Sequence, residues 1–101
     1  MIVLIAEMKV KPGYENILAD GCMKMAETVR ENEEGCMMYT PYVSLADPAE
    51  MIMVEKYADE QALEFHTQTP YYKEGMNKLK EILAAPMEVE RYNEEPTMMV
   101  T

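Results

Sequence analysis

The order in which the hydrophobic residues change their spacing constrains this chain most. Residues 2–10 alternate with a period of two, which is typical of a strand, and both faces begin apolar, which suits a central strand. Lys11-Pro12-Gly13 interrupts the pattern. From Tyr14 to Val29 apolar side chains recur at helical spacing, and Gly35 is predicted to be the glycine that follows the end of this helix.

Two further strand patterns and a second helical region follow. Residues 36–44 and 50–58 are rich in strand-forming side chains, and Asp47-Pro48-Ala49 between them predicts a hairpin. Asp59 is expected to cap a short helix through His66, and Thr69-Pro70 to begin a longer helix that ends at Ala85-Pro86. Residues 87–92 predict a last strand. The expected buried stripe of the longer helix consists of Tyr72, Met76, Leu79 and Leu83.

This β-α-β-β-α-β order predicts one ferredoxin-like α+β domain over residues 1–92, with the helices on one face of the sheet. A chain of 101 residues buries only about 65% of its unfolded surface, and the uncovered sheet face would expose apolar side chains. A second copy of the chain is the simplest cover, so we expect a homodimer. Residues 93–101 form a tail whose apolar end, Met98 to Val100, is predicted to cross to the partner.

Composition excludes several kinds of partner. The formal charge of −10 argues against nucleic acid and anionic membranes, because both require clustered Lys and Arg. No apolar run approaches the roughly 18 residues of a membrane span, and the opening apolar run lacks the basic stretch of a signal peptide. We therefore expect a soluble, cytoplasmic protein. Cys22 and Cys36 show neither CxxC spacing nor a disulfide framework and are expected to be reduced thiols.

His66, the only histidine, is the first candidate for catalysis because an imidazole titrates near neutral pH. It follows Leu63 by three residues and should face the sheet, where it could remove a proton from a phenol or from a carbon beside a carbonyl. A helix-end histidine bonded to a carbonyl is an equally good interpretation. Glu55 could orient His66, or it could form an ion pair with a Lys or Arg across a subunit boundary. The ion pair is the commoner arrangement.

The aromatic residues other than one phenylalanine are tyrosines, which together with Met could line a pocket for a flat ligand. Core and interface packing explains most of them, including Tyr42 and Tyr71, with Tyr57 and Tyr72 as the better pocket candidates. A single histidine cannot form a two-histidine metal site, and GxGxxG, P-loop and GxSxG motifs are absent, so neither metal nor cofactor is expected. The predicted substrate-binding residues are Tyr39, Tyr57, Phe65, Tyr72 and Met76.

Several segments resemble the antibiotic biosynthesis monooxygenase family over residues 1 to 92. They are Glu34-Gly35-Cys36, Glu55-Lys56-Tyr57, residues 62–72 (ALEFHTQTPYY), and Pro86 at the start of the last strand. The run H-x-x-T-P-[HY]-[FY] is the most specific of them. The resemblance implies a dimeric α+β barrel and oxygenation of quinols or phenols by molecular oxygen without metal or flavin. The chain has no Trp, Glu7 stands near the usual Asn, and Met76 replaces the haem-ligating His, which argues against haem degradation.

The first hypothesis is therefore a cofactor-independent oxygenase for a quinol-like small molecule, with His66 as base, Tyr57 and Tyr72 orienting the ring, and Glu55 as support. The second follows from the F-H-x-x-T-P-x-Y-K run, which is similar to that of a family isomerase for a phosphorylated ketone. In that enzyme class His66 would move a proton beside a carbonyl, and Lys56 or Lys73 would meet the phosphate. The third is a binding module without catalysis.

Overall fold

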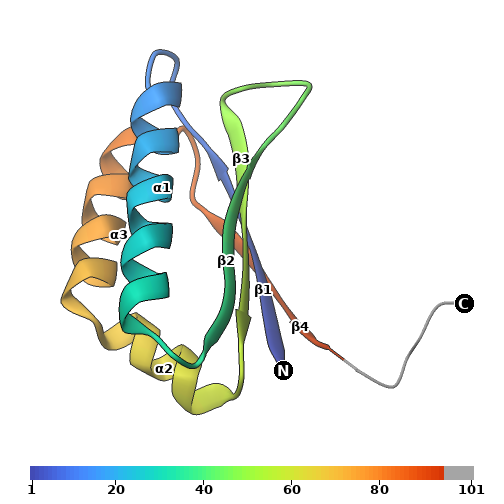
Figure 1. Ribbon diagram of the computed structural model, residues 1–101. Helices are drawn as coiled ribbons and strands as arrows, with labels where there is room; N and C mark the ends of the chain where they lie inside the picture. The colour runs from blue at the N-terminus through green and yellow to red at the C-terminus, as the bar shows by residue number, and fades with distance from the viewer. Residues whose placement is uncertain (95–101) are drawn as a thin grey trace, which may run out of the picture.

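The computed structural model describes residues 1–94 and contains a four-stranded antiparallel sheet with helices on one face (Figure 1). The strand order is β2-β3-β1-β4. The predicted ferredoxin-like α+β order is confirmed, with the second helical region divided in two. The elements are β1 (Ile2–Lys9), α1 (Glu15–Asn32), β2 (Cys36–Val43), β3 (Glu50–Tyr57), α2 (Glu60–Gln68), α3 (Pro70–Ile82) and β4 (Glu88–Asn93).

β1 lies inside the sheet, as its two apolar faces predicted, and pairs with β3 and β4. Leu4 lies opposite Glu55 and Ala6 opposite Met53, so these residues share the face that the helices cover. Val3 and Ile5 point to the other face, which carries no helix in Figure 1. Alternation along the strands therefore separates a covered face from an open face.

α1 packs Leu18, Cys22, Ala26 and Val29 against the covered face. It ends at Asn32, and Glu33 already has extended backbone angles, so the prediction that Gly35 terminates the helix is wrong. Within residues 1–94 the one positive φ belongs to Gly13, at 92°. Gly35 serves close packing instead, since a Cβ built there would lie 2.6 Å from the Cβ of Ala62. Space, rather than backbone conformation, explains this glycine.

Two side-chain caps form the boundaries of α2 and α3 as predicted. The Asp59 carboxylate accepts a hydrogen bond from the Ala62 N–H at 2.9 Å, and the Thr69 hydroxyl accepts one from the Tyr72 N–H at 3.2 Å. Pro70 occupies the first turn of α3. A backbone N–H has no partner within the helix at this position, so the lack of an N–H in proline costs no hydrogen bond. α3 ends at Ile82, before the predicted Ala85-Pro86. Its apolar stripe is only half-buried, because a cavity lies beneath it.

The hairpin turn between β2 and β3 is also confirmed. The Asp47 side chain accepts a hydrogen bond from the Ala49 N–H at 3.0 Å, and its carbonyl accepts one from the Glu50 N–H at 3.0 Å. Cys22 and Cys36 are free thiols, and burial raises the pKa of each to about 11. The predicted tail crossing lies outside the described residues. No helix within residues 1–94 is long and apolar enough to cross a membrane.

Candidate active site

The centre of the site is His66, which lies near the end of α2 and is 1% exposed. Its Nδ1 lies 2.9 Å from Oε2 and 3.1 Å from Oε1 of Glu33, the residue that caps the C-terminus of α1. An ionised carboxylate only accepts hydrogen bonds, so Nδ1–H is the donor. Because the Glu33 side chain is only 2% exposed, this pair is shielded from water and from salt.

Two further hydrogen bonds hold this pair in position. The Tyr71 hydroxyl donates to Oε2 of Glu33, so that oxygen receives hydrogen bonds from α2 and α3. The Thr69 hydroxyl donates to the carbonyl of His66 at 2.8 Å and thereby fixes the end of α2. Residues from α1, α2 and α3 therefore meet at one buried carboxylate.

Three tyrosine rings surround the imidazole. The ring of Tyr72 meets it edge-on, with centroids 4.9 Å apart, and those of Tyr39 and Tyr57 lie at 5.3 and 5.5 Å. The other nitrogen of the ring, Nε2, is buried and has no hydrogen-bond partner among residues 1–94. A buried polar atom without a partner is uncommon and points to a group that meets its partner only when a ligand is present.

Glu55 lies on the same covered face and is 7% exposed. Its Oε1 accepts a hydrogen bond from the Tyr57 hydroxyl at 2.6 Å. Burial raises the pKa of Glu55, and the hydrogen bond from Tyr57 and the charge of His66 only partly oppose that rise. Burial, with help from Glu55, also raises the pKa of Tyr57, so its hydroxyl stays a donor. Glu55 thus points into the protomer.

These groups border a cavity of about 600 Å³ between the covered face of the sheet and the helices, here called the inner cavity. Its polar groups include His66 and Glu55, and Tyr39 and Tyr72 contribute rings. A cavity of this size and character accommodates a flat, mostly apolar molecule with few polar atoms. Its apolar wall includes Leu4, Ala6, Met8, Met53, Met76 and Met87.

The structure brings together most of the residues predicted for the site. His66, Glu55, Tyr39, Tyr72 and Met76 line the inner cavity, while Tyr57 packs behind His66 with its side chain fully buried. Phe65 does not join them and is 57% exposed. Adjacent helical residues point about 100° apart, so when His66 faces inward its neighbour Phe65 faces solvent.

The lysines proposed for a phosphate lie elsewhere. Lys56 bonds Glu94 at 2.7 Å on the open face, and Lys73 contacts Gln68 at 3.5 Å. Neither lines the inner cavity, whereas Lys24 and Lys78 do. This placement corrects the expectation that Lys56 or Lys73 would meet a phosphate of the substrate. Alternation along β3 turns the Lys56 side chain to the face opposite that of Glu55 and Tyr57.

Sequence reasoning did not find Glu33 or Tyr71. Glu33 lies in the acidic run 31–34, which has the composition of a solvated helix end, and it meets His66 across 33 positions of sequence. Tyr71 was assigned to general packing. Tyr71 stands in the same run as His66, but no local spacing connects either residue to Glu33, since these contacts depend on how α1 ends against α2 and α3.

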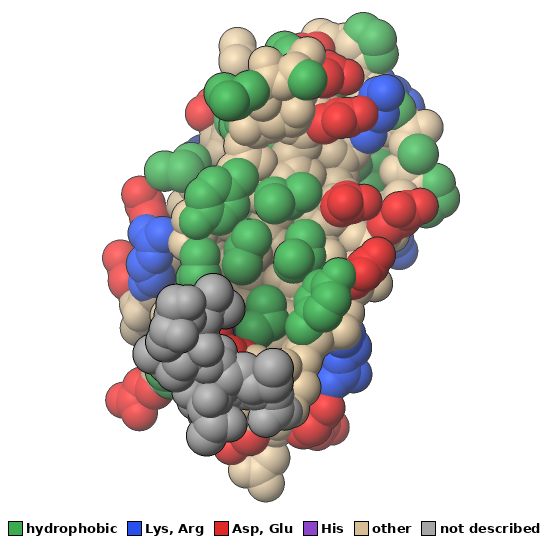
Figure 2. All heavy atoms as spheres, turned by 90° about the vertical axis from the view of Figure 1, so that its right-hand side faces the viewer, with side chains coloured by type: hydrophobic (Ala, Val, Ile, Leu, Met, Phe, Trp, Pro, Cys, Tyr) green, Lys and Arg blue, Asp and Glu red, His purple; other side chains and the backbone are tan. Residues whose placement is uncertain are grey.

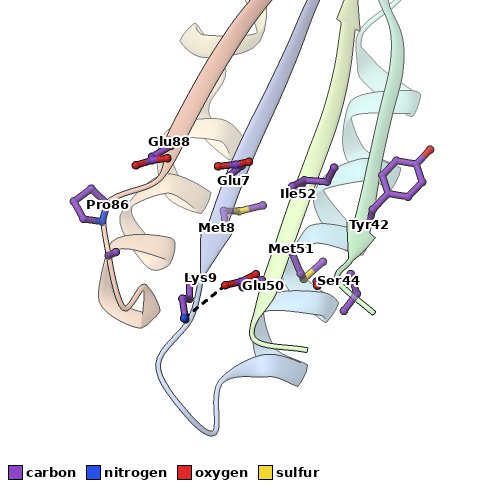
Figure 3. A pocket seen from close by; sticks show the side chains of 12 residues that line it. Glu7, Met8, Lys9, Tyr42, Ser44, Glu50, Met51, Ile52, Pro86 and Glu88 are labelled. Carbon is purple, nitrogen blue, oxygen red and sulfur yellow. Dashed lines mark ion pairs between the residues drawn. The ribbon is translucent and has the colours of Figure 1, made fainter. Parts of the chain in front are cut away.

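A second depression lies on the open face and is here called the open-face groove (Figure 3). It measures about 480 Å³ and carries the carboxylates of Glu7, Glu50 and Glu88 around Lys9. The Lys9 ammonium lies 3.6 Å from Glu50, and both side chains are half-exposed. Within residues 1–94 no group of three or more His, Cys, Asp or Glu side chains is arranged to hold a metal ion.

The sequence and fold correspond to a known family. The family model described as "Antibiotic biosynthesis monooxygenase" matches residues 1–78. The chain therefore belongs to the antibiotic biosynthesis monooxygenase family, and the predicted resemblance is confirmed.

Individual relatives agree with this assignment. "Putative monooxygenase YcnE" of Bacillus subtilis is 34% identical over 91 residues, which cover 90% of this chain and 95% of that protein. "Probable quinol monooxygenase YgiN" of Escherichia coli is 34% identical over 83 residues, covering 72% of this chain and 79% of that protein. The solved structure of a conserved protein from Methanosarcina mazei is 30% identical, with a TM-score of 0.85 and coverage of 93% and 92%.

Proposed function

We propose that this protein is a cofactor-independent oxygenase that acts on a quinol-like or phenolic small molecule. The observation that supports this most is the buried His66 ring, whose Nε2 lacks a partner among residues 1–94 and which borders a cavity lined by Tyr and Met. A nitrogen lone pair in such surroundings is suited to take a proton from a bound phenol. Similarity to a protein named as a quinol monooxygenase supports the same substrate class.

In the proposed reaction Nε2 accepts the phenolic proton, and the phenolate passes one electron to O2. The resulting radical pair joins through a carbon–oxygen bond to form a peroxide. The imidazolium returns the proton to the peroxide, and loss of water then breaks the O–O bond and removes the hydrogen of the same ring carbon, which becomes a carbonyl. One atom of O2 ends in the product and the other in water. The protein supplies a base, orientation and a dry pocket.

The other residues of the inner cavity have supporting roles in this proposal. Burial raises the pKa of Glu55, which favours its protonated form and lets it donate a hydrogen bond to a substrate oxygen. Tyr39 and Tyr72 orient the ring of the substrate, and Met76 adapts to its outline. Tyr57 keeps Glu55 and His66 in position from behind.

We further propose that the protein works as a homodimer that covers the open face of the sheet. Figure 2 shows apolar side chains gathered across this face with acidic side chains beside them. β1 and β3 contribute Val3, Ile5, Ile52 and Val54 to the open face. Light scattering at micromolar concentration is expected to give twice the monomer mass, and a clean monomer would contradict this proposal. A cytoplasmic location remains our prediction.

An isomerase of a phosphorylated ketone is a second candidate, because the same base could move a proton beside a carbonyl. Lys24 and Lys78, from α1 and α3, border the inner cavity and favour an anionic substituent on the ligand. Lys78 is already paired with Glu74 at 3.2 Å. A histidine bonded to backbone and remote from any cavity would favour the non-catalytic binding module, whereas His66 has a carboxylate partner and lines a cavity.

Oxygen uptake with a panel of reduced quinols and anthrones tests this proposal. We expect protein-dependent uptake that falls at least about a hundredfold in His66→Ala, since general base catalysis contributes about that much or more. Phe65→Ala, one position away and exposed, is the matched control and should retain the parent rate. Uptake at the uncatalysed rate across the panel would overturn the oxygenase, and turnover of phosphorylated ketones would then favour the isomerase.

A further inference from the structure

We propose that Glu33 and Tyr71 are positioning residues that together set the tautomer of His66. This inference rests on the proposed role of His66 as the base, and it assigns a purpose to Glu33 and to the Tyr71 of the H-x-x-T-P-[HY]-[FY] run. Glu33 accepts hydrogen bonds from both His66 and Tyr71 on the same oxygen, Oε2. The three residues come from three different helices or helix ends, so the contact forms only in the folded protein.

The backbone around Glu33 is fixed on both sides. Its N–H donates to the Val29 carbonyl at 2.9 Å, and its carbonyl accepts from the Cys36 N–H at 3.3 Å. The His66 backbone is fixed in turn by the Thr69 hydroxyl. Because both backbones are fixed, the Glu33 carboxylate stays close to the His66 imidazole. The carboxylate therefore determines which nitrogen of the imidazole carries the proton.

The carboxylate favours the tautomer with the proton on Nδ1. A carboxylate 2.9 Å away attracts Nδ1–H and would repel a lone pair on the same nitrogen. Nε2 then carries the lone pair beside the inner cavity. A catalytic histidine held by a buried carboxylate in serine proteases is oriented in the same manner.

Tyr71 holds the carboxylate of Glu33 in position. Its hydroxyl donates to Oε2, the oxygen that also accepts from Nδ1 of His66 at 2.9 Å. Burial and the bond to Glu33 raise the pKa of Tyr71 to about 12, so the phenol remains a donor throughout the neutral range. Without Tyr71 this oxygen loses one of its two donors, and the carboxylate is free to turn away from Nδ1.

Other ionisable groups face the same network and are present in every variant proposed below. They are Glu55 and Tyr57 from β3, Tyr39 and Cys36 from β2, and Tyr72 from α3. Because these groups are unchanged between the parent and the variants, a difference in the state of His66 reports on the substituted residue.

The single histidine allows a direct test, because the imidazole nitrogens of a labelled protein give one set of ¹⁵N signals. We expect the neutral imidazole of the parent to be the Nδ1–H tautomer. Tyr71→Phe should lower the ratio of the Nδ1–H to the Nε2–H tautomer about tenfold, the effect of losing one hydrogen bond to a charged group, because Glu33 loses the donor that holds it beside Nδ1. Glu33→Gln should populate the Nε2–H tautomer. Tyr42→Phe, an equal change on the open face, should leave the spectrum unchanged.

The outcomes separate this inference from the proposed function. A parent spectrum with the Nε2–H tautomer, or a Tyr71→Phe spectrum identical to the parent, would overturn the inference whatever the activity. The predicted spectra without oxygen uptake on any quinol would leave the positioning roles intact and count against the oxygenase. If Glu33→Gln does not fold, as judged by its amide spectrum, Tyr71→Phe alone still decides.

Discussion

The inner cavity and the open-face groove are similar in size, about 600 and 480 Å³, and both contain carboxylates, yet they differ in what those carboxylates do. In the groove Glu50 meets Lys9 at 3.6 Å with both side chains about half exposed. Beside the inner cavity Glu33, which does not line it, meets the lining residue His66 at 2.9 Å with side chains 2% and 1% exposed. The two regions share the same strands and differ mainly in access to water.

Access to water decides how much each interaction is worth. An exposed ion pair contributes about 0–1 kcal/mol, because solvent screens the charges and two long side chains must be ordered. A buried pair is costly to assemble and strongly destabilising to break, because the remaining group is left without a partner. We therefore propose the inner cavity as the active site because of its buried polar groups, one of which lacks a partner among residues 1–94, and not because of its volume.

The largest expected effect that tests this contrast is on stability. Glu33→Ala should lower the free energy of unfolding by about 3–5 kcal/mol, because it leaves the imidazole of His66 buried without its partner. The matched change in the groove, Glu50→Ala, should cost less than about 1 kcal/mol. Urea unfolding of both variants measures the difference, and equal losses would contradict the contrast.

A smaller loss is expected from one hydroxyl group. Tyr57→Phe removes the donor to the buried Glu55 and should destabilise the protein by about 1–3 kcal/mol, since Glu55 then lacks this hydrogen bond. Tyr42→Phe, on the open face, should change stability by less than about 0.5 kcal/mol. Thermal unfolding compares the two, and a neutral Tyr57→Phe would mean that water satisfies Glu55.

The pH dependence of stability should distinguish the two regions next. Because the pKa of Glu55 is raised in the folded state, folded Glu55 keeps a proton that an unfolded glutamic acid loses. Its contribution to stability is therefore present at low pH and is lost as the pH rises from the ordinary Glu range toward the raised value. Glu55→Gln should remove that loss, so its stability relative to the parent should increase with pH over this range. Glu88→Gln in the groove is the control, and parallel curves for Glu55→Gln and the parent would contradict the prediction.

The smallest effect is expected for the groove's own cation. Lys9→Ala breaks contacts of 3.6 Å to Glu50 and 4.0 Å to Asp47, all between exposed side chains. It should lower stability by less than about 1 kcal/mol, and added salt should shrink the difference further. Urea titrations at low and high salt check this, and a large, salt-independent loss would show that the groove is more than a solvated surface.

The fold could be predicted from the sequence because each element carries its own local signal. Alternation marks β1, the Asp47 turn joins β2 to β3, and Asp59 and Thr69 cap their helices as expected. Gly35 was recognised as special for the wrong reason, since a close approach to Ala62 is invisible without the packed structure.

The site could be predicted only in part. His66 and Glu55 follow from the helix spacing and from strand alternation, and the same helix spacing, applied to Phe65, would have placed that side chain outside the cavity. Glu33 meets both His66 and Tyr71 through the tertiary arrangement of three helical segments. These contacts join positions that lie 33 and 38 residues apart in the sequence, and no local pattern reveals them.

The most direct test of the account is to locate where a non-oxidisable phenol binds to the protein, by NMR chemical-shift mapping. The account predicts saturable shifts at His66, Glu55 and Tyr72, around the inner cavity, and a change in the Nε2 signal of His66 as it meets the hydroxyl. Shifts confined to Glu7, Lys9 and Tyr42, with an unchanged His66, would place binding in the open-face groove and contradict the account.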